Sequence, residues 1–185
     1  TSLAIIINDI NRAYSGEKLE PEGYTSYDLA LDNRDALAGD IYKNAENYYK
    51  SVFENAGGSI SFYPDKNGAA PTAELYHRET RSISVQDVKE FCKKHGITEN
   101  VFFISAFGIT LGKYNFKKDA VFTTIYHGRN DSRLSETVGM LVKTLPVFCD
   151  FSGTAKDCLN GVQKQLIDSM NNDIYPFSQI SHEFN

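Results

Sequence analysis

A long apolar segment, residues 101–111, limits how this chain can fold. Thr98 can cap a helix there, and that helix would have almost no polar side. A helix that is apolar all round belongs deep in a core. The preceding segment, Ser84 to Gly96, differs because it has a capping serine, Asp87 three residues later, and apolar residues on one face only. A surface helix followed by a buried one suits a layer of helices that covers a sheet.

Apolar residues at helical spacing predict three further helices. The first runs from Leu3 to Tyr14 with one buried face, and Gly16 ends it in the left-handed conformation that glycine adopts at little steric cost. The second runs from Ile41 to Ala56 and ends at Gly57-Gly58. The third spans Thr154 to Met170.

Two segments, Ala120 to Tyr126 and Thr137 to Cys149, are rich in β-branched and aromatic residues and are predicted strands. Glu74 to Ser84 alternates loosely and also reads as a strand, after a surface excursion over Ser59 to Ala73. Tyr24 to Asp32 is too short and mixed to assign, and we interpret it as a connection between layers or lobes. The element order predicts an α/β fold with a mixed sheet covered by helices.

Charge and cysteine content exclude several functions. The 185 residues carry a net charge of −5, and lysine and arginine are scattered, so we expect no nucleic-acid partner. The three cysteines show no paired metal-ligand spacing, which predicts a reducing compartment and no metal site. The apolar run Leu3 to Ile7 is too short for a membrane span and lacks a basic start. These features predict a soluble, cytoplasmic protein with no membrane partner.

Catalytic motifs that a sequence can reveal on its own are absent. There is no Gly-x-Ser-x-Gly elbow, no phosphate-binding glycine loop and no cysteine–histidine nucleophile pair. The spacing of the four histidines gives no reason to expect that they converge. Arg129, between Gly128 and Asn130 at the end of a predicted strand, is placed to pair with a carboxylate from another segment. The alternative is an ordinary surface arginine in a loop.

Three motifs, in order, carry a family resemblance. They are Gly128-Arg129-Asn130, the segment Val-Gly-Met-Leu-Val-Lys-Thr-Leu-Pro over residues 138–146, and Asp-Ile-Tyr-Pro-Phe over residues 173–177. Together they resemble the condensation domains of nonribosomal peptide synthetases. Leu141 and Lys143 depart from this pattern, because the family usually has Phe and Asn there. The helix from Leu3 resembles the one that follows the family's catalytic loop.

The resemblance implies a set of site residues. Arg129 is expected to form a structural salt bridge with the Asp of the family's motif His-His-x-x-x-Asp-Gly, which this sequence does not contain. The catalytic histidine is therefore expected upstream of Thr1, with no catalytic residue in this chain, and Arg129→Lys is expected to be nearly neutral here. The residues expected along the channel or in family motifs are His127, Gly128, Asn130, Gly139, Lys143, Thr144, Pro146, Tyr175, Pro176 and Phe177.

The same resemblance implies an architecture and partners. Family members have two lobes like chloramphenicol acetyltransferase with a tunnel between them, so residues 1–32 would end the N-terminal lobe and residues 33–185 would form most of a truncated C-terminal lobe. No cofactor would bind directly, because carrier proteins present the substrates on 4'-phosphopantetheine. Expected partners are peptidyl or aminoacyl carrier proteins, an adenylation domain of the same megasynthase, and the missing N-terminal lobe.

The implied function is amide-bond formation between a thioester donor and an amine acceptor in secondary-metabolite biosynthesis, with this chain inactive alone. Two alternatives remain open: a noncatalytic module that docks carrier proteins, and a coenzyme A-dependent acyltransferase. A separate expectation concerns the first helix. Cut from its lobe, its apolar face (Leu3, Ile6, Ile7 and Ile10) should cause self-association or leave the N-terminal segment mobile.

Overall fold

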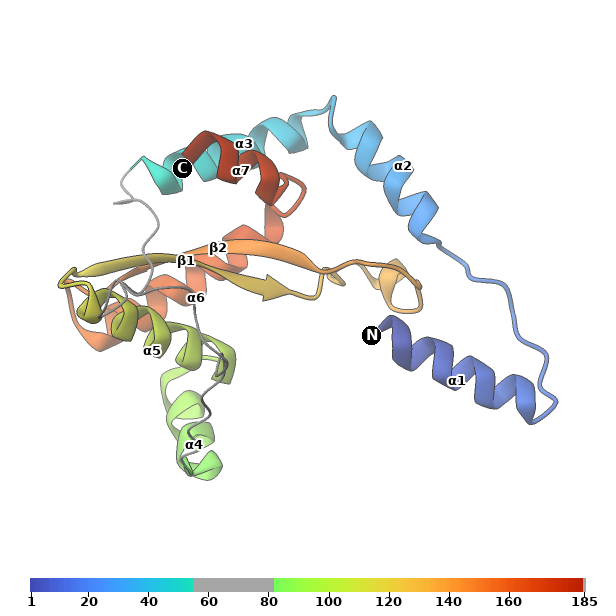
Figure 1. Cartoon of the computed structure of the whole chain (residues 1–185), viewed down its shortest axis with the longest axis horizontal. Coiled ribbons are helices and arrows are strands. Elements are labelled where there is room, and N and C mark those ends of the chain that lie inside the picture. Colours follow the sequence, from blue (N-terminus) through green and yellow to red (C-terminus); the bar gives the residue numbers. More distant parts are fainter. Residues whose placement is uncertain (55–81, 185) are drawn as a thin grey trace, which may run out of the picture. The chain divides into compact units, whose positions relative to one another are not determined.

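The computed structural model describes residues 1–54 and 82–184 of the chain. Its elements, in order, are α1 (Ser2–Tyr14), α2 (Ser26–Ala36), α3 (Asp40–Phe53), α4 (Val85–His95), α5 (Glu99–Tyr114), β1 (Asp119–Tyr126), the 3-10 helix η1 (Ser132–Leu134), β2 (Lys143–Asp150), α6 (Ala155–Asn171) and α7 (Phe177–Phe184) (Figure 1). Helix α3 ends at Phe53, before the predicted end at Gly57-Gly58. The predicted excursion Ser59–Ala73 and most of the predicted strand Glu74–Ser84 lie outside the described residues.

The described residues fall into two units. Unit 1 takes its residues from 1–55, 123–146 and 168–185, and unit 2 from 56–122 and 147–167. The strands β1 and β2 form a two-stranded sheet. Residues 123–126 of β1 and 143–146 of β2 belong to unit 1, and residues 119–122 and 147–150 belong to unit 2.

Unit 2 holds the larger apolar core, and its helices begin as the sequence predicts. Ser84 Oγ accepts a hydrogen bond from Asp87 N at 3.2 Å, and Gly96 ends α4 with a φ of +66°. The core consists of side chains from α4, α5, both strands and α6 (Val88, Cys92, Ile97, Val101, Ile104, Leu111, Ala120, Val147, Cys149, Cys158, Leu159, Val162 and Leu166).

The apolar helix α5 packs closely at one face and is open at the other. A Cβ at Gly108 would lie 2.7 Å from Cys149 Cβ, so the glycine allows helix and strand to approach. Phe103 and Phe107 are 48% and 46% exposed, which corrects the prediction that this helix lies deep in the core on all sides. Periodicity could not distinguish the two faces because both are apolar.

Unit 1 contains two helices that the sequence analysis did not assign. Helix α2 begins at a capping box in which Thr25 Oγ1 accepts from Asp28 N at 3.2 Å and Asp28 Oδ2 accepts from Thr25 N at 2.9 Å. Helix α7 lies beside α3 (Figure 1), and the small core between them includes Tyr49, Tyr175 and Ile180.

The second strand is shorter than predicted, because β2 begins at Lys143 instead of Thr137. Polar groups of residues 137–139 bond to other segments of unit 1. Thr137 Oγ1 donates to Tyr24 O at 2.6 Å, Val138 N to Glu22 Oε1 at 2.7 Å, and Gly139 N to Ser2 Oγ at 3.1 Å. Backbone donors used in this way cannot extend the ladder with β1.

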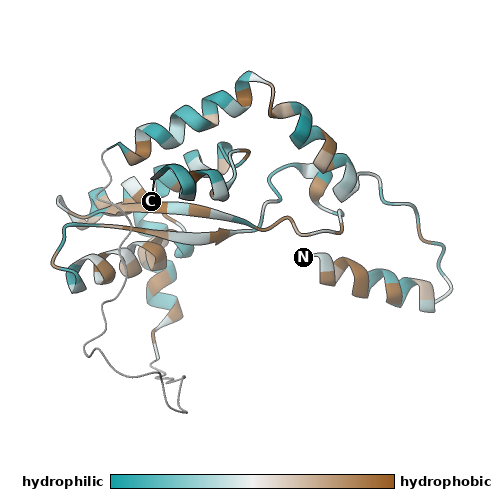
Figure 2. Ribbon diagram, turned by 45° about the horizontal axis from the view of Figure 1, so that its top comes forward, coloured by the Kyte–Doolittle hydropathy of each residue, from teal (hydrophilic) through white to brown (hydrophobic). Residues whose placement is uncertain are grey.

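Helix α1 forms as predicted, with Gly16 at a φ of +82°, but none of its residues is buried. Leu3 and Ile10 are 66% and 61% exposed, so the predicted buried face is wrong for this chain, and apolar residues recur along the helix in Figure 2. The exposed face agrees with the expectation of an uncovered apolar patch. Over residues 1–54 and 82–184, no helix is long and apolar enough to cross a membrane.

Candidate functional site

The loop after β1 requires glycine at position 128. Gly128 has a φ of +67°, and a Cβ there would lie 1.8 Å from Leu141 O. The following backbone amide, Arg129 N, donates to His127 Nδ1 at 3.0 Å. This local geometry brings residue 141 against the turn and fixes where the Arg129 side chain begins.

The Arg129 guanidinium has neutral acceptors within unit 1. Its Nη1 donates to Leu134 O and, at 3.5 Å, to Ser135 O, while Nη2 donates to Ser2 Oγ at 3.1 Å. Arg129 is therefore not an unpaired side chain, and these contacts lead us to expect a loss of stability for Arg129→Lys instead of a nearly neutral effect. Its salt bridge to a motif Asp stays a prediction.

Ser2 connects the first helix to two family motifs. Its Oγ donates to Gly139 O at 2.8 Å and accepts from Gly139 N at 3.1 Å as well as from Arg129. One hydroxyl hydrogen and two acceptor lone pairs are the full capacity of a serine side chain. The sequence gives no sign of this role, since a serine at a helix start is ordinarily explained by the helix itself.

Lys143 connects the second and third motifs. Its Nζ lies 2.8 Å from Asp173 Oδ1 and 3.0 Å from Asp173 O. The two side chains are 31% and 23% exposed, so solvent screens the pair less than a fully exposed one. The lysine that departs from the family pattern therefore has a definite acidic partner within the chain.

Lys143 and Asp173 line two cavities in unit 1. The first, of about 610 Å³, is lined by Lys143, Thr144, the segment Asp173–Ser178 and one face of α2 that includes Asn33 and Arg34. The second, of about 540 Å³, is lined by Gly128, Asn130, Lys143 and Asp173 among others. Gly128 and Asn130, residues 143–144 and residues 173–177 are far apart in sequence and meet around one pair of cavities.

The structure gathers most, but not all, of the predicted residues at these cavities. Gly128, Asn130 and Lys143 line the second, and Lys143, Thr144, Tyr175, Pro176 and Phe177 line the first. Arg129 and three others are not among the lining residues: His127 is exposed, Gly139 is half-buried against Ser26, and Pro146 is buried within β2. Helix α2, which lines both cavities, had no sequence assignment.

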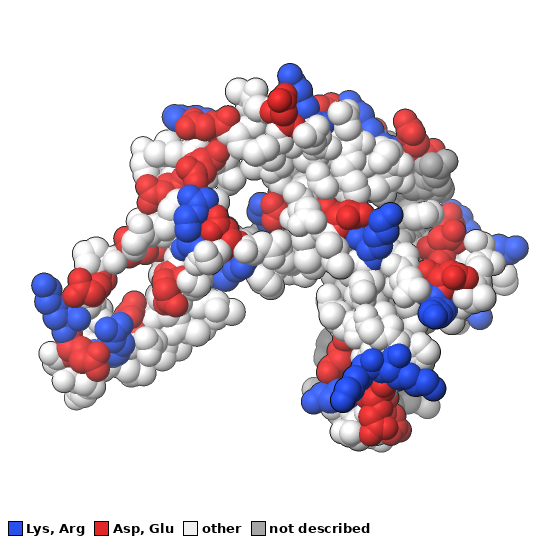
Figure 3. Space-filling model, turned by 180° about the vertical axis from the view of Figure 1, so that it is seen from behind, with Lys and Arg blue, Asp and Glu red and all other residues white. Residues whose placement is uncertain are grey.

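A charged network that the sequence did not predict lines the second cavity. Arg133 pairs with Asp131 at 2.7 Å and Asp32 at 3.0 Å, and its guanidinium lies 4.4 Å from the centre of the Tyr24 ring. The hydrogen bond from Arg133 lowers the pKa of Asp131 below its ordinary value. Acidic and basic groups are likewise interspersed over the face shown in Figure 3.

The Tyr175 side chain is buried next to the first cavity. Its hydroxyl donates to Glu183 Oε1 at 2.8 Å, and its ring lies 5.9 Å from that of Tyr49 in a stacked arrangement. Burial raises the pKa of Tyr175, and the hydrogen bond to Glu183 acts in the same direction. The tyrosine therefore stays neutral and holds α7 in place.

The chemistry available at these cavities is binding and orientation. Lysine, carboxylate, amide and hydroxyl groups line them, and a fixed set of such groups can hold two reactants in position. Within residues 1–54 and 82–184 no group of three or more His, Cys, Asp or Glu residues is arranged to hold a metal ion.

Comparison with known proteins identifies the family. The family model described as "Condensation domain" matches residues 1–185. The nonribosomal peptide synthetase sidC of Arthroderma benhamiae is 28% identical over 183 residues, which are 97% of this chain and 3% of that protein. The chain belongs to the condensation-domain family.

Solved structures show the same fold. The first condensation domain of the calcium-dependent antibiotic synthetase has a TM-score of 0.75 at 14% identity, covering 100% of this chain and 43% of that one. The X-domain in complex with OxyB from teicoplanin biosynthesis has a TM-score of 0.73 at 16% identity, covering 98% and 43%. The predicted α/β, chloramphenicol acetyltransferase-like fold is confirmed, and the chain spans less than half the length of these structures.

Proposed function

We propose that this chain is part of a condensation domain that forms amide bonds in nonribosomal peptide biosynthesis. A donor thioester and an acceptor amine, both carried on 4'-phosphopantetheine, are its substrates, and peptidyl or aminoacyl carrier proteins are its partners. An adenylation domain of the same megasynthase and an N-terminal lobe complete the assembly. Membership of the family and the multidomain relatives support this proposal.

One observation carries the proposal beyond family membership. The Lys143–Asp173 pair joins two motifs at the wall of both cavities, with Gly128 and Asn130 on the second. Side chains in this arrangement can orient an acyl donor and an amine. Holding two reactants in the correct orientation supplies much of the rate of a bimolecular transfer. In this proposal, proton transfer or positioning by histidine belongs to the family's His-His-x-x-x-Asp-Gly motif, which this sequence does not contain.

The test is dipeptide formation on carrier proteins. A donor carrier loaded with an aminoacyl thioester and a loaded acceptor carrier are mixed with the parent protein that contains the histidine motif, and acceptor-bound dipeptide is measured by intact-protein mass spectrometry. We expect product with the parent and none with the 185-residue chain alone. Product from the chain alone would overturn the expectation that the histidine is supplied from elsewhere, and an inactive parent would overturn the condensation proposal.

A docking function is the second candidate. The similar X-domain structure is a complex with another protein, OxyB, so this fold also occurs in a protein–protein assembly. A docking module would bind carrier proteins in a pull-down and yet leave the loaded thioesters unreacted. A parallel reaction with an acyl-coenzyme A donor tests the acyltransferase alternative, which predicts transfer without any carrier protein.

A further inference from the structure

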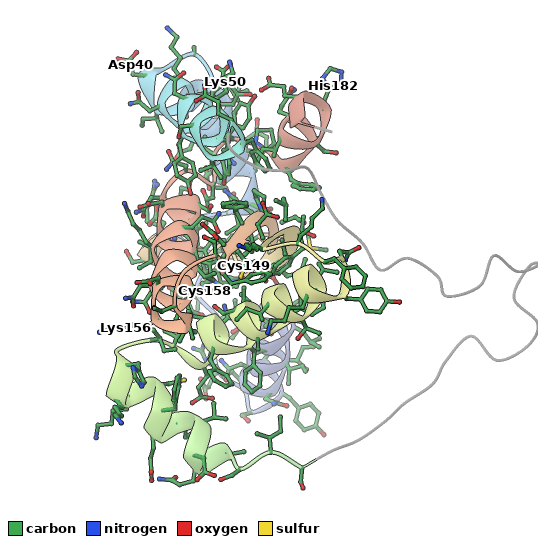
Figure 4. The ribbon with its side chains drawn as sticks, turned by 90° about the vertical axis from the view of Figure 1, so that its left-hand side faces the viewer. Asp40, Lys50, Cys149, Lys156, Cys158 and His182 are labelled. Carbon is green, nitrogen blue, oxygen red and sulfur yellow. The ribbon has the colours of Figure 1, made fainter. Side chains whose placement is uncertain are left out.

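Two buried cysteines of unit 2 lie in contact. Cys149 Sγ on β2 is 3.4 Å from Cys158 Sγ on α6, and Figure 4 shows the two side chains next to each other. They are 0% and 2% exposed and both are free thiols. The third cysteine, Cys92 on α4, is also buried and free, which makes it an internal reference.

The surroundings make the two thiols unequal. The hydrogen bond between them raises the pKa of Cys149, and burial adds to this increase. The same hydrogen bond lowers the pKa of Cys158, against the opposing effects of burial and the Asp150 carboxylate. Cys158 also lies in the first turn of α6, where the helix dipole favours a negative charge. Cys158 is therefore the thiol that ionises first.

Cys158 borders a cavity. The residue lines a cavity of about 300 Å³ together with Ser152, Gly153, Asp157 and Gly161. Hydrogen peroxide is about the size of a water molecule, and a cavity of this size can admit it. A buried thiol that no reagent can reach is inert. The cavity next to Cys158 therefore distinguishes this pair from a cysteine that is enclosed in a core.

We propose that Cys149 and Cys158 are a modification site, an oxidisable dithiol that a peroxide closes into a disulfide between β2 and α6. The Cys158 thiolate attacks a peroxide oxygen, and the O–O bond breaks to give a sulfenic acid and hydroxide. The Cys149 sulfur then attacks the sulfenic sulfur, and the S–O bond breaks as water leaves. Two thiols lose two electrons and two protons, and hydrogen peroxide is reduced to two waters.

The cross-link would stabilise unit 2. It closes a short loop that contains the start of α6, where Thr154 Oγ1 donates to Asp157 Oδ2 at 2.6 Å. A disulfide restricts the unfolded chain more than the folded one when the native geometry already holds the sulfurs together. The oxidised protein should therefore melt at a higher temperature than the reduced protein.

Peptide mapping of the native protein tests the proposal. The full protein is exposed to hydrogen peroxide, its remaining thiols are alkylated in denaturant, and it is digested with trypsin. Trypsin cuts after Lys156, which lies between the two cysteines, so the disulfide would join peptides 144–156 and 157–164 with a mass about 2 Da below their sum. We expect this linked pair together with alkylated Cys92. The proposal would be overturned if Cys149 and Cys158 were both recovered in alkylated form. It would also be overturned if peptides cross-linked through Cys92 were as abundant as the pair that joins Cys149 to Cys158.

Matched variants separate this reaction from random oxidation. Cys92→Ser should leave the linked peptides and the rise in melting temperature on oxidation unchanged. Cys149→Ser should abolish both and leave Cys158 as a sulfenic acid that a dimedone probe captures. Because the mapping uses the unsubstituted protein, its result stands even if a variant folds poorly. A second comparison oxidises folded protein and protein that has first been unfolded in denaturant. Equal yields of linked peptide from the two samples would also contradict the role assigned to the folded geometry.

Discussion

At the scale of single residues, Gly128 has the strictest steric requirement in the candidate site. Its left-handed backbone and the approach of Leu141 O leave no room for a side chain. We predict that Gly128→Ala lowers the free energy of unfolding by about 2–4 kcal/mol, because a strained φ and a backbone clash add together.

Gly161→Ala is the matched control for this substitution. Gly161 lies within α6, and a Cβ there meets no heavy atom within 4 Å. Alanine at an open helix position should stabilise the chain by about 0.5–1 kcal/mol. Denaturant melts of both variants measure the difference, and equal stabilities would show that the turn at residue 128 tolerates a side chain.

Arg129 gives a second prediction at this scale. Lysine cannot reproduce the planar guanidinium that reaches Leu134 O and Ser2 Oγ from two nitrogens. We predict that Arg129→Lys costs about 1–2 kcal/mol in the 185-residue chain, in the range for hydrogen bonds from charged groups.

A double-mutant cycle with Ser2→Ala isolates the contact between these two side chains. Groups in direct contact typically show a coupling of about 0.5 kcal/mol or more, and we expect a value of that size from denaturant melts. A single-variant loss within about 0.5 kcal/mol, with no coupling, would instead support the view that Arg129 acts as an unpaired surface residue in this chain.

At the scale of elements, the tyrosines that join α3 to α6 and α7 predict a pH response. Tyr49 is fully buried, and its hydroxyl donates to Ser169 O at 3.3 Å. Burial raises the pKa of Tyr49 above its ordinary value, so the fold favours the neutral phenol. Above pH of about 10 the unfolded chain loses this proton while the folded chain keeps it, and stability falls as pH rises.

Tyr49→Phe tests this response. The variant should lose about 1 kcal/mol at neutral pH with the hydrogen bond to Ser169. Above pH of about 10 its stability should decline less steeply than that of the original chain. The reason is that the variant lacks the Tyr49 phenol, whose pKa is higher in the folded chain than in the unfolded chain. Thermal melts between neutral and alkaline pH measure both slopes, and parallel curves would show that Tyr49 does not carry the effect.

The sequence predicted those elements whose signals are local. Ser84 and Gly96 mark the two ends of α4, and Thr98 marks the start of α5, where its Oγ1 accepts from Val101 N. Helix α2 was not assigned because its apolar residues form no clear stripe, although Thr25 and Asp28 supply a capping box. That pair was the signal that could have found it.

Long-range contacts account for the remaining differences. The start of β2 depends on where residues 137–139 send their hydrogen bonds, and their partners, Glu22 and Ser2 among them, are more than a hundred positions away in sequence. Residues from all three motifs line the cavities, but the sequence did not predict that Lys143 pairs with Asp173. Spacing along a chain carries no information about such pairings.

At the scale of the whole molecule, α1 predicts association. Its apolar side chains Leu3, Ile7 and Ile10 are 66%, 49% and 61% exposed, and a contiguous patch of this kind usually marks an interaction surface. We predict that the 185-residue chain self-associates in sedimentation experiments and that Ile10→Ser reduces the association. A strict monomer with slow amide exchange from Leu3 to Tyr14 would contradict this prediction.

The position of the boundary between lobes also belongs to this scale. The two units of the structure are each assembled from separate stretches of chain. The predicted division into residues 1–32 and 33–185 refers to the lobes of a complete condensation domain, and it stays a prediction. A structure of the parent protein would test it by showing which lobe contains α1 and which contains α2.

Single-turnover dipeptide formation by the parent protein tests most directly whether the site organised by Lys143 and Asp173 serves condensation. We compare Lys143→Met with Lys164→Met, an exposed control on α6, after circular dichroism confirms that both variants are folded. The account predicts that Lys143→Met slows acceptor-bound product formation by about tenfold or more, because misplacement of reacting groups is costly, while Lys164→Met keeps the original rate. An unchanged rate in folded Lys143→Met would contradict it.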